Sequence, residues 1–255
     1  MINLSNIGNR GILSLLAMAL FFTALPASSI EKSQCSIALV LAQDVSGSVD
    51  STEFHLQKDG LANAFRDTEV IELIELLPGG IYVALTQWSG QHDQRLVIDW
   101  THILNASDAN SFAEQLDNDR RVRSRSLTAI GQALLQADHL LRSKMSLCKR
   151  KVIDVSSDGR NNAGPDASTV ADALALKGIV INALVIVGRD SSLITYFQQE
   201  IIRGPEAFVQ PAIGYRDYAI AIKQKLLREL TPALAENLPT QPIDTNINKF
   251  TSLVK

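Results

Sequence analysis

The hydrophobic pattern of the chain alternates between short continuous apolar runs and segments with helical spacing. Residues 36–43 form an unbroken apolar run, as expected for a strand buried on both faces of a parallel sheet. Asp50 and Glu53 have the spacing of a helix capping box, and apolar positions at helical intervals continue to about Arg66. Further strands are expected at 81–88, 94–100, 151–156, 180–187 and 207–210, and further helices at 69–77, 107–116, 129–144, 166–176, 192–202 and 217–230.

This order of elements predicts one α/β domain over residues 30–230, with a doubly wound, Rossmann-like and mostly parallel sheet. The strands at 81–88 and 94–100 are separated by a short polar turn, so we expect a hairpin that adds one antiparallel edge strand. Residues 231–255 lose the helical periodicity and gain Pro, Asn and Thr, which predicts a flexible C-terminal tail.

The first 29 residues have the pattern of a secretory signal peptide. Arg10 and the α-amino group supply positive charge, residues 11–25 are almost wholly apolar, and small residues follow. This apolar stretch is shorter than the ~20 residues needed to span bilayer hydrocarbon, which favours a cleaved leader over an uncleaved anchor. We therefore expect a periplasmic or secreted protein with no membrane span after cleavage.

The composition excludes several classes of partner and of fold. Lys and Arg number 24 and Asp and Glu number 27, so the basic surplus typical of nucleic-acid-binding proteins is missing. The chain is 46% hydrophobic, enough for a sizeable core, and 2 Cys are too few for a disulfide scaffold. The histidines His55, His92, His102 and His139 have no paired metal-binding spacing, so we expect no zinc site.

Oxygen-bearing side chains follow the first predicted strand. Asp44, Ser46 and Ser48 lie at positions i, i+2 and i+4 between a strand and a helix, where open α/β sheets bind ligands. Such donors favour a hard cation, Mg²⁺ first, with Ca²⁺ or Mn²⁺ as alternatives. Thr128 begins another predicted helix, and Asp158 follows the predicted strand at 151–156, so a second carboxylate leaves the sheet at the same edge.

In this order, the Asp-Ser-Ser set, the helix-start Thr and the strand-end Asp-Gly resemble the von Willebrand factor A domain and its metal-ion-dependent adhesion site. The resemblance covers about residues 35–230. Gln43 and Ser157 occupy flanking positions where other residues are common, and all five donors are in place. Four segments look like an uncharacterised family of exported bacterial proteins that carry this domain: Asp44-Val45-Ser46-Gly47-Ser48-Val49-Asp50, Trp88-Ser89-Gly90, Thr128-Ala129-Ile130-Gly131 and Val152-Ile153-Asp154-Val155-Ser156-Ser157-Asp158-Gly159.

The resemblance implies a role for each of the five donors. Ser46 and Ser48 would bind the ion directly, and Thr128 directly or through water. Asp44 and Asp158 would act mostly through water. Because neutral hydroxyls leave the ion electrophilic, an acidic residue of a partner protein can complete its coordination. The implied function is therefore an exported, non-enzymatic, adhesion-type module that binds an unidentified protein.

The resemblance also implies a disulfide between Cys35 and Cys148. In that fold, the strand ending at Asp44 lies beside and parallel to the strand ending at Asp158. Cys35 precedes Asp44 by 9 residues and Cys148 precedes Asp158 by 10, so both thiols would reach the opposite edge of the sheet. Two separate buried thiols are the alternative, and an oxidising compartment favours the bond.

Residues near the expected site have two interpretations each. The loop before Thr128 is rich in arginine: Arg120, Arg121, Arg123 and Arg125. This loop is either a solvated charged segment or an electropositive rim that attracts an acidic partner. Trp88 and Ser89 lie in the hairpin near the same rim, where they either contact the ligand or pack at the edge of the sheet.

Two other functions stay open on the sequence. One is a metal-dependent hydrolase or phosphatase, and the other is a structural domain that binds no ligand. A phosphatase of the haloacid dehalogenase type needs Asp at the position of Ser46, and the chain has no G-x-S-x-G elbow. The retention of all five donors disfavours a domain without a ligand.

Overall fold

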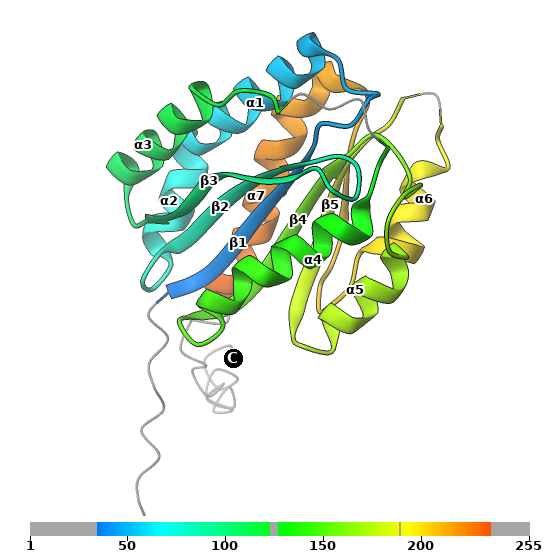
Figure 1. Ribbon diagram of the computed structural model, residues 1–255. Helices are drawn as coiled ribbons and strands as arrows, with labels where there is room; N and C mark the ends of the chain where they lie inside the picture. Colours follow the sequence, from blue (N-terminus) through cyan, green and yellow to red (C-terminus); the bar gives the residue numbers. More distant parts are fainter. Residues whose placement is uncertain (1–34, 123–126, 189, 236–255) are drawn as a thin grey trace, which may run out of the picture. The chain divides into compact units, whose positions relative to one another are not determined.

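The computed structural model describes residues 35–122, 127–188 and 190–235. Within these ranges, six strands form one sheet in the order β3-β2-β1-β4-β5-β6 (Figure 1). The strands are β1 (Cys35–Asp44), β2 (Ile81–Trp88), β3 (Gln94–Ile103), β4 (Cys148–Ser157), β5 (Ile179–Ile186) and β6 (Val209–Ala212). β2 and β3 pair antiparallel, and the other neighbouring strands pair parallel. The prediction of a doubly wound, mostly parallel sheet with an antiparallel edge is confirmed.

Helices cover both faces of the sheet. They are α1 (Ser51–Arg66), α2 (Thr68–Leu76), α3 (Ala106–Asp117), α4 (Ile130–Leu141), α5 (Ala167–Ala175), α6 (Leu193–Tyr196) and α7 (Tyr218–Ala235), with short helical turns η1 (Arg142–Lys144), η2 (Phe197–Ile201) and η3 (Tyr215–Asp217). α1, α2, α3 and α7 pack on one face, and α4, α5 and α6 pack on the other (Figure 1). Among the described helices, none is long and apolar enough to cross a membrane.

Some element boundaries differ from those predicted, each for a local reason. α3 begins at Ala106 because Asn105 caps it, accepting hydrogen bonds from the backbone N–H groups of Ser107 and Asp108. The helix expected at 192–202 is a short α helix followed by a wider π-helical turn. α7 continues through Pro232 to Ala235, because residues beyond Leu230 still pack into the core.

The disulfide between Cys35 and Cys148 is confirmed. The two residues are direct partners in the parallel register of β1 and β4, and their Cα atoms are 4.6 Å apart. This separation lies in the ordinary range for a disulfide. The bond therefore joins the two central strands at their amino ends, opposite the edge that carries the candidate metal ligands.

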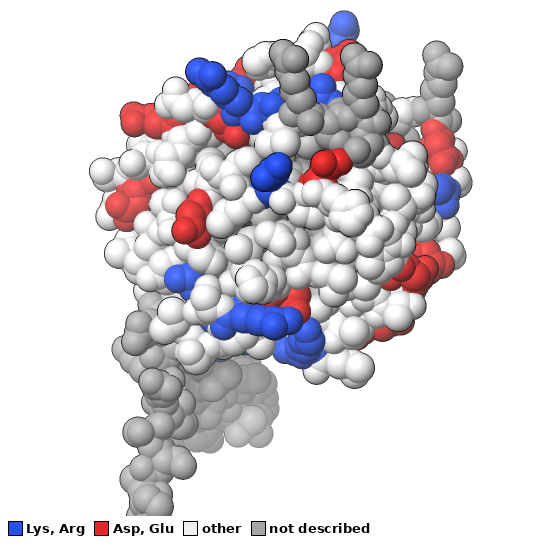
Figure 2. Space-filling model, in the orientation of Figure 1, with Lys and Arg blue, Asp and Glu red and all other residues white. Residues whose placement is uncertain are grey.

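Acidic and basic side chains are interspersed on the face of the molecule shown in Figure 2. This mixture agrees with the formal net charge of −3 for the whole chain. Mixed surface charge favours solubility and gives no extended basic field on this face.

A cluster of charged side chains lies inside the core, between α7 and the sheet. Lys225 is fully buried, and its Nζ lies 2.7 Å from Asp154 Oδ2 and 3.2 Å from Glu229 Oε2. The Nδ2 of Asn182 donates a hydrogen bond to Glu229, and the backbone N–H of Phe208 donates to Asn182 Oδ1. Burial raises the pKa of Asp154 to about 7, although the nearby lysine opposes the shift. The interior carboxylates therefore have their own cation within the fold.

The carboxyl ends of β1 and β4 form the switch point of the sheet. β1 lies between β2 and β4, so the chain first builds one half of the sheet and then returns to build the other. Connections leave this point in opposite directions, which opens a crevice where ligands bind in folds of this kind. Because Gln43 pairs with Ser156, the segments that begin at Asp44 and Ser157 emerge side by side.

Candidate metal centre

The loop after β1 is shaped by hydrogen bonds to Asp44. Asp44 Oδ1 accepts a hydrogen bond from the backbone N–H of Ser46 at 2.7 Å, and Asp44 Oδ2 accepts one from Ser157 Oγ at 2.5 Å. The backbone N–H of Val49 donates to the carbonyl of Ser46 at 3.1 Å, which closes a turn around Ser48. Both carboxylate oxygens are thus used to fix the loop, and the two serine hydroxyls are directed to the same side.

Three hydroxyls and one carboxylate from three separate segments converge beside this loop. Ser46 Oγ lies 3.3 Å from Ser48 Oγ and accepts a hydrogen bond of 3.4 Å from Thr128 Oγ1. Ser48 Oγ donates to Asp158 Oδ1 at 2.8 Å. Neighbouring oxygens in an octahedral Mg²⁺ shell, with Mg–O of 2.0–2.1 Å, are about 3 Å apart. The spacing of these four oxygens therefore fits a small, hard divalent cation.

Burial and charge differ across the site. Asp44, Ser46 and Thr128 are buried, Ser48 is exposed and Asp158 is half-buried, so the site opens outward on the side of Ser48 and Asp158. Burial raises the pKa of Asp44 to about 6; the hydrogen bond from Ser157 opposes this shift, and the negative charge of Asp158 adds to it. A bound divalent ion would favour the ionised carboxylate.

The side chains at this site differ from an ordinary cluster of metal-binding residues. Within the described ranges, His, Cys, Asp and Glu side chains do not gather in groups of three or more that could hold a metal. In the same ranges, no Lys or Arg lies within ion-pair distance of Asp44 or Asp158. The site therefore combines neutral hydroxyls with two carboxylates that lack a cationic partner among the described side chains.

Thr128 is positioned by the loop that follows β4. Its backbone N–H donates to Asn162 Oδ1 at 2.8 Å, and its carbonyl accepts a hydrogen bond from the backbone N–H of Asn162 at 2.9 Å. Asn161 Oδ1 accepts a hydrogen bond from the backbone N–H of Gly131 in the first turn of α4. These contacts link the segment of Thr128 to the segment of Asp158, so the two donors keep their relative positions.

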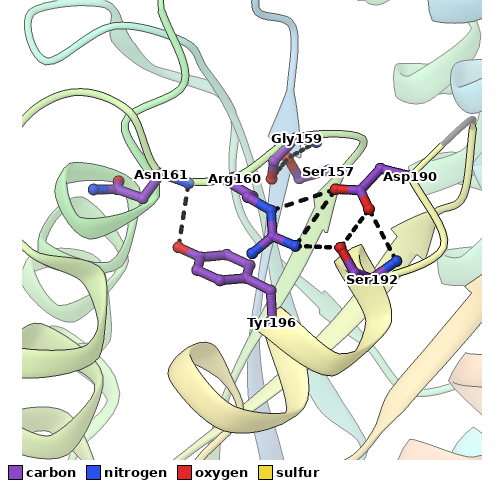
Figure 3. Close-up of polar contacts among 7 residues, drawn as sticks. All are labelled: Ser157, Gly159, Arg160, Asn161, Asp190, Ser192 and Tyr196. Atoms are coloured by element: carbon purple, nitrogen blue, oxygen red, sulfur yellow. Dashed lines mark hydrogen bonds and ion pairs between the residues drawn. The ribbon is translucent and has the colours of Figure 1, made fainter.

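Arg160 anchors the same loop on its other side (Figure 3). Its guanidinium donates to Ser192 Oγ at 2.7 Å and to Asp190 Oδ2 at 3.4 Å, and it lies over the ring of Tyr196 at 4.7 Å. The hydroxyl of Tyr196 accepts a hydrogen bond of 3.2 Å from the backbone N–H of Asn161. The loop that carries Asp158 is therefore fastened to α6 and to the segment that precedes it.

Three further residues support the site, and the sequence analysis did not identify their roles. Ser157 holds Asp44, as described above. Arg121 Nη2 donates to the carbonyls of Val45 and Ser46, each at 3.2 Å. Tyr215 donates its hydroxyl hydrogen to Asp158 Oδ2 at 2.9 Å.

Of these three supporting residues, only Ser157 could have been identified from its position in the sequence. Ser157 ends a strand directly before Asp158. Arg121 belongs to the arginine-rich loop, but the sequence does not distinguish it from its neighbours there. Tyr215 had no signal, because it lies 57 residues from the carboxylate that it contacts.

The predicted ligand rim is corrected in part. Trp88 and Ser89 are both fully buried, and Trp88 packs in the core between the sheet and α4, so neither residue is available to a ligand at a rim. Of the two interpretations, burial of both residues disagrees with contact to a ligand and agrees with packing against the sheet. The position of a hairpin in the sequence does not show which side chains turn inward. Arg123 and Arg125 lie outside the described residues.

Comparisons with known proteins place the chain among von Willebrand factor A-like folds. A family model described as "Protein of unknown function (DUF1194)" matches residues 34–234, and no curated protein matches the chain. Proximal thread matrix protein 1 from the mussel byssus is 18% identical over 77% of this chain and 48% of its own, with a TM-score of 0.58. The pilus adhesin SpaC from Lactobacillus rhamnosus GG is 17% identical over 79% of this chain and 31% of its own, with a TM-score of 0.56.

A third similar structure matches over nearly its whole length. The vWF domain of the type V pili tip protein Mfa5 from Porphyromonas gingivalis is 10% identical over 78% of this chain and 96% of its own, with a TM-score of 0.55. The chain spans less than half of the other two structures. At these identities the likeness shows the fold alone, and it confirms the predicted resemblance.

Proposed function

The chain belongs to the DUF1194 family of proteins of unknown function, and we propose that it is an exported, metal-ion-dependent protein-binding module. The proposed ligands of the divalent cation are Asp44, Ser46, Ser48, Thr128 and Asp158. We propose Mg²⁺ as the ion, with Ca²⁺ or Mn²⁺ as alternatives. An acidic residue of the partner protein completes the coordination.

The observation that carries this proposal is the convergence of three hydroxyls and a carboxylate at O–O distances of 2.8–3.4 Å. Two neighbouring carboxylates without a cationic partner in the described chain favour a cation from solution. The bound ion would supply a positive, electrophilic centre. Ser46, Ser48 and Thr128 bring no charge of their own, so much of the positive charge remains available to a partner carboxylate.

Asp44 and Asp158 have different tasks in this proposal. Asp44 uses both of its oxygens inside the protein, which suits an anchor that holds the loop and acts through water. Asp158 is half-buried and lies beside exposed Ser48, at the open side of the site. A partner would approach from this side.

Similar structures give independent support. Proximal thread matrix protein 1 has been solved with a zinc-occupied MIDAS motif, at 16% identity and a TM-score of 0.55 to this chain. SpaC is a pilus adhesin, and Mfa5 is a pilus tip protein. These neighbours are consistent with metal binding and adhesion outside the cytoplasm. The signal peptide at residues 1–29 lies outside the described residues and stays a prediction.

A hydrolase is less well supported by the contacts of the serines. In the part of the chain that the structure describes, no histidine is hydrogen-bonded to Ser46 or Ser48, so neither hydroxyl has an imidazole base beside it. The arrangement therefore suits ion binding better than nucleophilic attack by a serine.

Metal binding by the purified chain is the first test. We expect isothermal titration with MgCl₂ to show one site, and Mg²⁺ to raise the melting temperature above that in EDTA, since the ion binds only the folded state. Ser48→Ala should abolish both effects. The matched control is Ser143→Ala, an exposed serine whose hydroxyl donates to the carbonyl of Leu140 in a different part of the fold.

The second test is capture of a protein from the native envelope with and without chelator. Retention that depends on Mg²⁺ and is lost in Ser48→Ala would support a binding module. Turnover of phosphate or carboxylic esters that is lost in Ser48→Ala would instead support the enzyme. Absence of binding to Mg²⁺, Ca²⁺ and Mn²⁺ would leave a structural domain without a ligand.

A further inference from the structure

A cleft of about 590 Å³ opens directly beside the candidate metal centre. Asp158 and Tyr215 line both: Asp158 accepts the hydrogen bond from Ser48 on the metal side, and its other oxygen accepts one from Tyr215 on the cleft side. The cleft is therefore continuous with the proposed metal site. Any segment that brings a carboxylate to the ion also brings its neighbouring residues to the mouth of this cleft.

The floor and one wall of the cleft are apolar. Ile186, at the end of β5, is buried beneath it, while Ile213 is 80% exposed and Leu56 is 36% exposed. Ile213 belongs to the segment after β6 and Leu56 to α1, so two distant parts of the chain present aliphatic side chains to one space. Single exposed aliphatic residues are common, but a pair that lines a cleft beside a binding site is typical of an anchor pocket.

Acidic and basic side chains line the cleft from different elements. Asp50 and Glu53 line it at the start of α1, where each carboxylate accepts a hydrogen bond from a backbone N–H of the capping box. Neither residue has an ion pair with a described Lys or Arg. Arg216, in η3, also lines the cleft and is exposed. A basic group is therefore favoured near the start of α1 and disfavoured near Arg216.

We propose, on the basis of the proposed function, that this cleft binds the residues next to the partner's metal-binding acidic residue. The partner presents an extended segment with three features: a carboxylate for the ion, an aliphatic side chain for Ile213 and Leu56, and a Lys or Arg for Asp50 and Glu53. The cleft thus determines which acidic segments bind, since the ion accepts any accessible carboxylate.

The test is selection of random heptapeptides displayed on phage, using the immobilised full chain in MgCl₂ and elution with EDTA. We expect eluted peptides to carry Asp or Glu together with an aliphatic and a basic residue. Ile213→Ser should remove the aliphatic preference, and the double variant Asp50→Asn, Glu53→Gln should remove the basic preference. Asn and Gln retain the capping hydrogen bonds of α1, so the helix start is kept.

Two further variants separate the cleft from general effects on the surface. Leu176→Ser removes an aliphatic side chain that is 91% exposed and does not line the cleft, and should leave the selection unchanged. Gly188→Val adds a side chain that lines the cleft at a position where an added Cβ meets no atom within 4 Å, and should weaken binding of a selected peptide. Ile213→Ser should weaken the same peptide roughly tenfold, with unchanged affinity for MgCl₂.

Each outcome of the selection decides between the two proposals. Acidic peptides without an aliphatic or basic preference, bound equally by Ile213→Ser, would overturn the role of the cleft and leave the metal-dependent module standing. Absence of any EDTA-eluted peptide would overturn both. Peptides that carry an acidic, an aliphatic and a basic residue, and whose aliphatic or basic preference disappears only in the cleft variants, would support both proposals.

Discussion

Two pairs of carboxylates lie at different depths in this fold, and among the described side chains only the interior pair has a cation beside it. Asp154 and Glu229 lie inside the core with Lys225 between them, at 2.7 and 3.2 Å. Asp44 and Asp158 lie at the carboxyl edge of the sheet, where their described hydrogen-bond donors are hydroxyls and one backbone N–H. The interior pair carries its counterion on α7, whereas no described side chain supplies one to the pair at the edge.

This difference separates a structural cluster from a candidate binding site. A fixed lysine lies beside the interior carboxylates whenever the protein is folded, so that cluster needs no metal ion from solution. The edge pair has no such lysine among the described residues and opens to solvent beside Ser48, so in the proposed function a cation from solution neutralises it. Asp44, whose pKa is raised beside an accessible edge, is therefore a better candidate for function than Asp154, whose pKa is raised inside the closed core.

The largest expected effect follows from removal of the interior counterion. Lys225→Met leaves Asp154 and Glu229 buried without a cation, and we expect a loss of about 3–5 kcal/mol in the free energy of unfolding. Urea denaturation monitored by circular dichroism measures the loss. Addition of MgCl₂ should not restore it, because the cluster is closed to solvent.

A triple variant controls for the change in volume at Lys225. Replacement of the whole cluster by Lys225→Met, Asp154→Leu and Glu229→Gln removes the charges together and keeps an acceptor for Asn182. We expect this variant to recover most of the stability lost in Lys225→Met. If the single variant lost less than about 1 kcal/mol, the interior cluster would not be the self-contained ion network described above.

The residues of the edge cluster were named from the sequence, and the interior cluster was not identified from it, for physical reasons. Asp44, Ser46 and Ser48 follow a continuous apolar strand directly, so their place at the edge of the sheet follows from local sequence alone. Lys225 and Glu229 lie four residues apart on a helix, a spacing typical of exposed ion pairs, and only the tertiary packing of α7 shows that they are buried.

Long-range contacts account for what the sequence analysis missed at the site itself. Arg121 reaches the loop after β1, and Tyr215 reaches Asp158, from distant segments, and no local pattern marks either of them. For Trp88 the sequence left contact with a ligand and packing against the sheet open, since a continuous apolar run does not indicate which layer receives each side chain. The fold class followed from the order of elements, whereas the supports of the site follow from contacts that only the folded chain creates.

At the edge, removal of a carboxylate should have the opposite effect on the metal-free protein. Asp44→Asn relieves repulsion between two neighbouring negative charges and keeps an acceptor for the backbone N–H of Ser46. We expect the free energy of unfolding in EDTA to stay equal or to rise by up to about 1 kcal/mol. The gain from Mg²⁺, about 2.7 kcal/mol at 100 times the dissociation constant, should disappear.

Chemical denaturation in EDTA and in MgCl₂ measures both quantities for Asp44→Asn. Glu72→Gln is the matched control, because it removes an exposed carboxylate on α2, away from the site, and should keep the full gain from Mg²⁺. Strong destabilisation of Asp44→Asn in EDTA would mean that the edge pair, like the interior pair, is already neutralised within the fold.

The interior cluster should also give stability a specific dependence on pH. The pKa of Asp154 is raised from 3.8 to about 7 by burial, so between these values the folded state holds a proton that the unfolded state has lost. Stability from this group is therefore complete below pH 4 and is lost as the pH rises to about 7, with a slope of up to about 1.4 kcal/mol per pH unit.

Urea denaturation from pH 4 to pH 8 compares the wild type with Asp154→Asn, and the difference between the two curves isolates this group. Lys225, Glu229 and Tyr218 face Asp154 and are common to both proteins. Relative to the wild type, Asp154→Asn should become steadily more stable as the pH rises through this range. A flat difference curve would show that Asp154 titrates alike in the folded and unfolded states.

The smallest expected effects come from two tyrosines that lie three residues apart and serve different clusters. Tyr215 donates to Asp158 at the edge, whereas Tyr218 is buried close to Asp154 of the interior cluster. Tyr215→Phe should weaken Mg²⁺ binding roughly tenfold with a stability loss of at most about 1 kcal/mol, because a hydrogen-bonding partner of a ligand is removed. Tyr218→Phe should change the free energy of unfolding by at most about 1 kcal/mol and leave Mg²⁺ binding unchanged, because its hydroxyl lies near Asp154 and not at the edge. Isothermal titration and urea denaturation of the two variants test the separation directly, and equal loss of Mg²⁺ affinity in both would show that the two clusters act as one.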